Sequence, residues 1–382
     1  MSQGKVSSSF SNGLAMFSMF FGAGNITFPL AIGLAVQGGL PYALCGLIIT
    51  AVMMPFAGLM AITLFNGDYE PFFQRMGKIP GFMTIVILLL LIGPFGGIPR
   101  CITITYSTMK VYFPSFSLVP FSLLACLLLY VMCLKRTKIL SIIGNVLSPV
   151  LLVFLMAIVI KGLFFTEWRP LEAGHTPHPF WYGLVQGYNT MDLLAAFFFS
   201  SLVCTRLKRE KSKSLVAPVL KASCIGGGLL SLIYIGFSYV AARHSVELSD
   251  VPMEQLLGTL GHIVLGPYAG FFVCMSISLT CLTTALALTV ICAEFIRDKL
   301  LHEKVRFQEA LIGVLLISLL VCTLEFHGIV HLLMPVLTVI YPALLVLSLS
   351  NMMYKLYSFQ RVKLPVYLCI SFSLFVLLLK TL

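Results

Sequence analysis

The chain of 382 residues is 59% hydrophobic and only 10% charged, with a mean hydropathy of +1.01 and a formal net charge of +11. Soluble globular chains carry about 25% charged residues, so this composition predicts an all-α integral membrane protein, and the long unbroken apolar runs exclude a transmembrane β-barrel. The basic charge does not indicate nucleic-acid binding, because most Lys and Arg residues fall in loops on one side of the predicted spans, a bias that places the N-terminus in the cytoplasm.

Hydropathy predicts about eleven transmembrane helices within one membrane transport domain, residues 1–382. The first span is expected to be retained, since no small-residue cleavage site follows it. We expect the protein to lie in the plasma membrane, which is the inner membrane in bacteria, in contact with lipid. The expected spans are 9–36, 40–65, 81–110, 117–134, 139–163, 185–206, 217–243, 262–296, 306–322, 328–350 and 365–382.

The first span contains "FGAGNITFP" at residues 21–29, which places two glycines, an asparagine and a proline where a helix is weakest. Irregular backbone survives at membrane depth only where it is buried in protein or lines a cavity. A helix broken there offers free N–H groups to a carboxylate and free carbonyls to a cation. Asn25 adds a carbonyl oxygen that suits a cation. The pattern fits a zwitterionic amino acid bound beside a small cation.

Arg100 in the third span and Asp192 in the sixth are the clearly intramembrane charges. They lie about 7 Å and about 5 Å from the centres of their spans, both towards the outer face of the membrane. Each charge costs about 2.5–3.5 kcal/mol on insertion scales, so both are expected to face a cavity or each other. We predict that they neutralise one another or bracket a polar path, with a role in coupling or gating. A static ion pair that fixes helix packing is the alternative.

The sixth span repeats the interruption with "QGYNTMD" at residues 186–192. Five spans precede it, and because five is odd, the first and sixth spans run in opposite directions. The two halves are therefore predicted to be inverted repeats, residues 9–163 and 185–350, followed by an additional helix at 365–382. Interrupted segments at corresponding positions of two such halves indicate a substrate site.

Three other stretches contain polar groups that allow both a functional and a purely structural interpretation. Residues 246–261 predict a short helix near Pro252, either a lid over an outer vestibule or a surface helix. The eighth span contains a dense set of hydroxyls, which either bond their own helix or line a sodium-type site. These are Ser276, Ser278, Thr280, Thr283 and Thr284. His327 and His331 lie one turn apart, but no third metal ligand is evident, which favours interfacial side chains.

Six motifs in chain order resemble those of the branched-chain amino acid:cation symporters. They are "FGAGNITFP", "GPFGGIPR", "GNVLSP", "GYNTMD", "TCLTTALALTVICAEF" and "MPVLTVIYP". The resemblance implies a LeuT-like fold of two inverted five-helix repeats in which helices 1 and 6 are broken. It also implies import of leucine, isoleucine and valine on a cation gradient. A membrane enzyme would need clustered nucleophile, base or metal ligands at one depth, and the sequence does not show them, so we expect no enzymatic activity and no cofactor beyond a co-transported sodium ion or proton.

Carried over by resemblance, the substrate-binding residues are Gly22, Ala23, Gly24, Gly187, Tyr188 and Asn189. The cation-binding residues are Ser18, Phe21, Asn25, Thr280, Thr283 and Thr284, with sodium at the carbonyls of Ser18 and Phe21 and the hydroxyls of Thr283 and Thr284. Some proton-coupled carriers of this fold place a Lys amine from helix 5 at the sodium position. The fifth span has no Lys or Arg before Lys161, which favours sodium. A proton-coupled carrier of other neutral amino acids, or a channel or sensor, remains the alternative.

Overall fold

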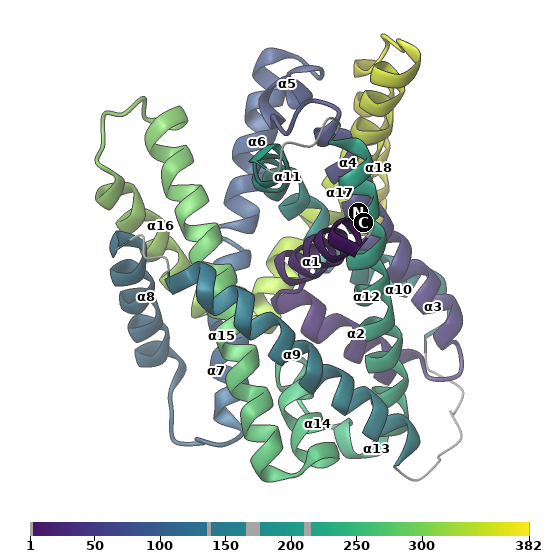
Figure 1. Cartoon of the computed structure of the whole chain (residues 1–382), viewed down its shortest axis with the longest axis vertical. Coiled ribbons are helices and arrows are strands. Elements are labelled where there is room, and N and C mark those ends of the chain that lie inside the picture. Colours follow the sequence, from purple (N-terminus) through teal and green to yellow (C-terminus); the bar gives the residue numbers. More distant parts are fainter. Residues whose placement is uncertain (1–2, 136–138, 166–175, 210–214, 382) are drawn as a thin grey trace.

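The computed structural model describes residues 3–135, 139–165, 176–209 and 215–381, and every regular element in these ranges is a helix (Figure 1). The first half of the chain contains α1 (Gln3–Phe20), α2 (Ala23–Val36), α3 (Leu40–Ile48), the π-helical turn η1 (Ile49–Met53), α4 (Met54–Thr63), α5 (Tyr69–Gln74), α6 (Lys78–Ile92), α7 (Gly97–Lys110), α8 (Leu118–Lys135) and α9 (Ile139–Phe164). The second half contains α10 (Pro179–Asn189), α11 (Asp192–Arg209), α12 (Val216–Arg243), α13 (Ser245–Leu248), the 3₁₀ turn η2 (Met253–Gln255), α14 (Leu256–Leu265), α15 (Pro267–Phe295), the π-helical turn η3 (Ile296–Leu300), α16 (Phe307–Cys322), α17 (Glu325–Tyr357) and α18 (Lys363–Thr381).

Each predicted span coincides with one helix or with two or three helices in series, which confirms the all-α class. Of the described residues, five helices are long and apolar enough to cross a membrane, or up to six if the bent pair α1–α2 is one span. The remaining apolar helices are shorter, among them α8, α16 and α18. The count of eleven spans therefore stays a prediction.

The first predicted interruption separates α1 from α2, and the two axes differ by 77°. Gly22 caps α2 in an extended conformation, with φ −125° and ψ −165°. Pro29 lies inside α2 and lacks the N–H that would bond the carbonyl four residues earlier, although its own carbonyl accepts a hydrogen bond of 2.7 Å from Ser238 Oγ of α12. The break therefore lies within "FGAGNITFP", the part of the apolar run whose glycines predicted a weak helix.

The second interruption separates α10 from α11. Met191 at the junction has a φ of 63°, in the left-handed region that a residue with a side chain rarely adopts. Thr190 Oγ1 donates to the Gly187 carbonyl over 2.9 Å and so satisfies one of the free carbonyls at the end of α10. The break is held by local hydrogen bonding.

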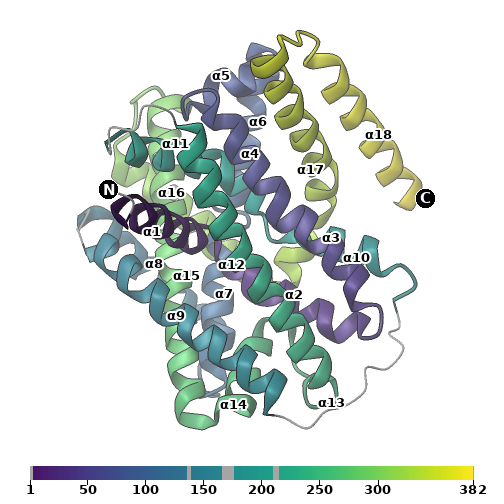
Figure 2. The same cartoon turned by 45° about the vertical axis from the view of Figure 1, so that its right-hand side comes forward.

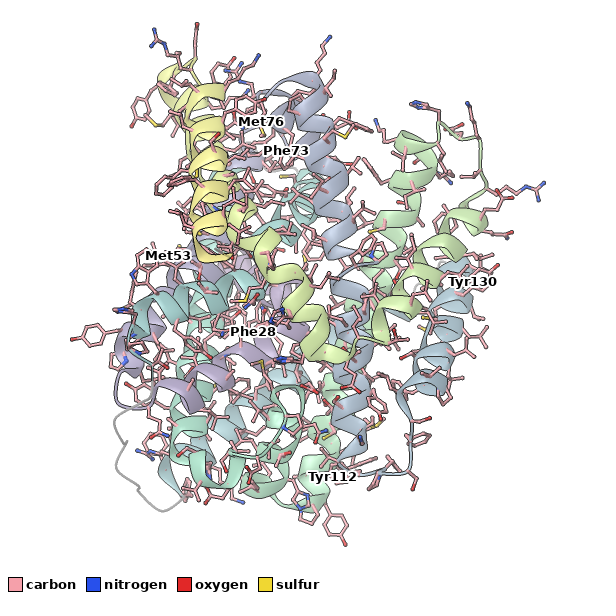
Figure 3. All side chains as sticks on the ribbon, turned by 180° about the vertical axis from the view of Figure 1, so that it is seen from behind. Phe28, Met53, Phe73, Met76, Tyr112 and Tyr130 are labelled. Carbon is pink, nitrogen blue, oxygen red and sulfur yellow. The ribbon has the colours of Figure 1, made fainter. Side chains whose placement is uncertain are left out.

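The two breaks touch each other at the centre of the molecule. A Cβ atom at Gly24 would lie 2.8 Å from Thr190 Cα, so only glycine permits this approach of backbone to backbone. Figure 3 shows Phe28 of α2 about midway between Met76 and Tyr112, which lie towards opposite ends of the molecule. The breaks thus meet at mid-depth, as expected for corresponding segments of two repeats.

Two peripheral features complete the fold. Residues near Pro252 form α13, η2 and α14, which confirms the predicted helical structure in that loop. At the other edge, α18 lies beside α17 (Figure 2).

Candidate functional site

A cavity of about 510 Å³, including its open mouth, lies where the two breaks meet. We call it the break cavity. Its lining residues are Met19, Phe20, Gly22, Ala23, Gly24, Asn25, Ile92, Gly97, Arg100, Cys101, Thr190, Met191, Asp192, Ala195, Phe199, Thr284 and Leu288. The polar part of this wall comes from the two breaks together with Arg100 and Thr284, and the rest is apolar.

The start of α2 supplies backbone donors to the break cavity. Gly22, Ala23 and Gly24 all line it, and the first N–H groups of a helix have no intrahelical acceptor. Next to Gly22 there is open space, because a Cβ atom built there would meet nothing closer than Thr284 Cγ2 at 3.8 Å. The positive end of the α2 dipole and these donors suit a carboxylate.

Asn25 joins the first break to the second. Its Nδ2 donates to the Phe20 carbonyl over 2.6 Å and to Asp192 Oδ1 over 3.3 Å. Because both partners are acceptors, the amide nitrogen must face them, and its Oδ1 then points elsewhere without a hydrogen-bond partner among the described residues. Asn25 therefore connects the end of α1 to the start of α11 and leaves one oxygen free.

Arg100 and Asp192 both line the break cavity, and no ion pair joins them among the residues that the structure describes. Each charge instead lies at one side of the second break. Arg100 Nη1 donates to the carbonyl of Asn189 over 2.6 Å, at the negative end of the α10 dipole. Asp192 is the first residue of α11, at the positive end of the next dipole. Both charges are stabilised by helix ends, which explains how they are tolerated without pairing.

The guanidinium of Arg100 lies in an aromatic layer. Its central carbon is 5.7 Å from the Phe28 ring centroid and 6.0 Å from that of Phe326, and the two ring centroids are 6.2 Å apart. Phe28 and Phe326 line a second cavity, whereas Arg100 lines the first. The Arg100 layer, meaning Arg100, Phe28 and Phe326, therefore separates the two cavities.

The three substrate residues expected in the sixth span do not line the break cavity. At Gly187 a Cβ atom would come 1.8 Å from Thr50 Oγ1, so the glycine allows α10 to pack against α3 and η1. Tyr188 stacks on Tyr341 of α17, with ring centroids 4.7 Å apart. Asn189 contributes its carbonyl to Arg100, and its side chain lines the second cavity.

The cavity wall from this span comes from the following turns instead, at Thr190, Met191, Asp192, Ala195 and Phe199. Sequence reasoning missed Ala195 and Phe199. The spacing of 192, 195 and 199 follows one helix face, and it would have identified them once Asp192 was assigned to the cavity.

The predicted sodium ligands are only partly brought to the break cavity. Thr284 lines it beside Gly22, whereas Ser18, Phe21, Thr280 and Thr283 lie outside its lining. Thr280 Oγ1 donates to Ser276 and Thr283 Oγ1 to Thr280, each over 2.9 Å, which is the backbone bonding that the sequence left open as the alternative. These hydroxyls keep their lone pairs, and the sodium site stays a prediction.

The sequence and the fold of this chain are both similar to those of known transporters. The family model described as "Branched-chain amino acid transport protein" matches residues 5–382. Two Bacillus subtilis (strain 168) proteins are each 29% identical to the chain: branched-chain amino acid permease BraB, over 91% of this chain and 80% of its own length, and branched-chain amino acid permease BrnQ, over 86% and 77%.

Solved structures show the same fold at lower identity. The inward-facing conformation of Mhp1 has a TM-score of 0.69 at 15% identity, over 91% of this chain and 77% of Mhp1. MhsT in complex with L-phenylalanine has a TM-score of 0.63 at 14% identity, over 97% and 98%. Both are LeuT-fold transporters, so the predicted fold class of inverted repeats with helices 1 and 6 broken is confirmed.

Proposed function

We propose, because the chain belongs to the branched-chain amino acid transport protein family, that it imports leucine, isoleucine and valine by symport with sodium through alternating access. The observation that carries this proposal is the meeting of two broken helices at one cavity in a chain of that family. Such breaks provide seats for an anion and for a cation side by side.

The break cavity suits an aliphatic amino acid at both of its ends. The substrate carboxylate would accept from the N–H groups at the start of α2, next to Gly22, where the wall is open. The ammonium group would face the free carbonyls at the end of α1. The side chain would contact apolar groups such as Ile92, Phe199 and Leu288, which favour a hydrocarbon over a polar side chain.

Two buried side-chain oxygen atoms that accept no hydrogen bond from any described residue support a cation site beside the substrate. Asn25 Oδ1 and Asp192 Oδ2 are buried and have no hydrogen-bond partner within the described residues. The Tyr234 hydroxyl of α12 lies close enough to interact with both side chains. Oxygen ligands of this type suit a hard cation such as sodium. Thr284 contributes a further hydroxyl to the wall of the same cavity.

Alternating access requires a barrier on one side of the substrate while the other side is open. The Arg100 layer provides such a barrier between the break cavity and the second cavity. We assign Arg100 to gating and Asp192 to coupling. Opening of this side would require the Arg100 guanidinium to leave the Asn189 carbonyl.

The test is uptake of labelled leucine by the purified protein in liposomes. We expect saturable uptake driven by an inward sodium gradient, with isoleucine and valine as the strongest competitors among the twenty amino acids. Uptake driven by a proton gradient in strictly sodium-free buffer would replace sodium by protons. If no amino acid is bound or transported, the transport proposal is wrong.

A further inference from the structure

The second cavity lies beyond the Arg100 layer, and the loop after α12 contributes to its wall. Its lining residues are Phe28, Gln186, Asn189, Met253, Phe326, His327, Val330, His331 and Met334. Met253 belongs to η2, so the segment 246–261 supplies one residue of this lining. We call this space the histidine cavity, because two imidazoles lie on its wall.

His327 and His331 are four residues apart near the start of α17 and therefore lie one above the other on one face of the helix. Their ring centroids are 6.3 Å apart. Both side chains are exposed and line the cavity. Because they are exposed, small side-chain rotations are enough to bring one nitrogen of each ring to the distance of about 2.0–2.1 Å from a shared metal ion.

The surroundings favour a cation at these imidazoles. Glu254 of η2 lies close enough to His327 for their charges to interact, and Glu325 adds a second carboxylate. Lys110 of α7 is the opposing positive charge in this group. Burial raises the pKa of Glu254 above its usual range, which shows that its charge is poorly solvated. Asn189 Oδ1 is buried on the same cavity wall and has no hydrogen-bond partner in the described part of the chain.

We propose that His327 and His331 form a binding site for a divalent transition-metal ion at the histidine cavity. Imidazole nitrogen suits Ni²⁺, Cu²⁺ and Zn²⁺, and paired histidines at i and i+4 are a recurrent way to hold such ions on a helix. The described residues contain no group of three or more His, Cys, Asp and Glu side chains able to hold a metal, so water completes the coordination. The site does not depend on the transported substrate.

A bound ion would occupy the histidine cavity next to the Arg100 layer. It would also attract Glu254 of η2 towards α17, because the carboxylate and the ion carry opposite charges. Movement of η2 or of Phe326 is then opposed while the ion is bound. The site is thus placed where a bound metal ion would oppose opening of the Arg100 layer.

The test uses Ni²⁺ and the full chain purified without a polyhistidine tag. Nickel is preferred to zinc because the exposed thiols of Cys45 and Cys224 would also bind zinc. Calorimetric titration with Ni²⁺ at about pH 8 should show one site. His327→Ala and His331→Ala should each weaken binding by at least about tenfold.

His262→Ala is the matched control, since His262 lies on α14 beside Tyr112 and outside the histidine cavity. Its Ni²⁺ affinity should equal that of the unaltered protein. The melting temperature of each variant without metal shows whether it is folded, and its increase on adding Ni²⁺ gives a second reading of binding. The proposal is wrong if the unaltered protein binds no Ni²⁺, or if folded His327→Ala and His331→Ala proteins bind it as tightly as the control.

Discussion

Replacement of Asp192 by asparagine tests the cation arrangement directly. The carboxylate lies at the start of α11, accepts from Asn25 Nδ2 over 3.3 Å and lines the break cavity. An asparagine side chain at this position has nearly the same size as the aspartate and lacks its negative charge. We therefore expect the helices to keep their positions while the cavity loses affinity for a cation.

The expected magnitude follows from the contacts that change. A hydrogen bond to a charged group contributes about 1.5–3 kcal/mol, and every 1.4 kcal/mol corresponds to about tenfold in an equilibrium constant. The sodium concentration for half-maximal leucine uptake should rise by about 10-fold to about 100-fold in Asp192→Asn. Asp192→Glu, which keeps the charge on a longer side chain, should be affected less.

The assay is uptake of labelled leucine into liposomes over a range of sodium concentrations and at several pH values. Ser318→Ala is a suitable control, because Ser318 is fully buried in α16 and bonds only its own helix, at Val314. It should leave the sodium dependence unchanged. If uptake by Asp192→Asn has an unaltered sodium dependence at every pH, Asp192 has no coupling role and the reasoning is refuted.

Three further outcomes follow from the described contacts. Arg100→Lys keeps the charge but loses the planar donor to the Asn189 carbonyl, so uptake should fall by about tenfold, and equal rates would remove Arg100 from gating. Gly187→Ala forces its Cβ against Thr50, and overpacking of about 1–3 kcal/mol should lower the melting temperature in detergent. Adding Thr50→Gly should restore part of the lost melting temperature. An unchanged melting temperature in Gly187→Ala would contradict this packing. Burial raises the pKa of Glu254, so the protonated carboxyl favours folding and this advantage is lost as pH rises through the raised pKa. Glu254→Gln should therefore raise the melting temperature at about pH 7 and change it little at about pH 4. A larger increase at about pH 4 than at about pH 7 would be inconsistent with that shift.

The sequence alone predicted the class of fold and the two helix breaks that line the candidate site. Apolar runs of sufficient length left helices as the only spanning structure, and glycines with asparagine in two of them located the breaks at 21–24 and 186–192. Five spans precede the sixth, and because five is odd, the sequence predicted that the first and sixth spans run in opposite directions. The structure places Gly22, Gly24, Asn25 and Asp192 at one cavity, all of which the sequence had selected.

Only the tertiary structure decided which groups face that cavity. Gly187 and Gly24 look alike in sequence, yet Gly187 packs against Thr50 whereas Gly24 lies at the contact of the two breaks. The rotation of a helix about its axis is set by its neighbours, and a shift of one residue turns a side chain by about 100°. Sequence pattern therefore predicted the span but not the face.

The same limit applies to the two intramembrane charges. Their shared depth predicted that Arg100 and Asp192 either neutralise one another or bracket a polar path. Both line one cavity, and no ion pair joins them among the described residues. Each charge lies instead at a helix end created by the second break, at Asn189 for Arg100 and at the start of α11 for Asp192. Helix dipoles and free carbonyls arise only when the chain is folded. The residue identities therefore determined that these charges need partners. Tertiary contacts determined which partners they have.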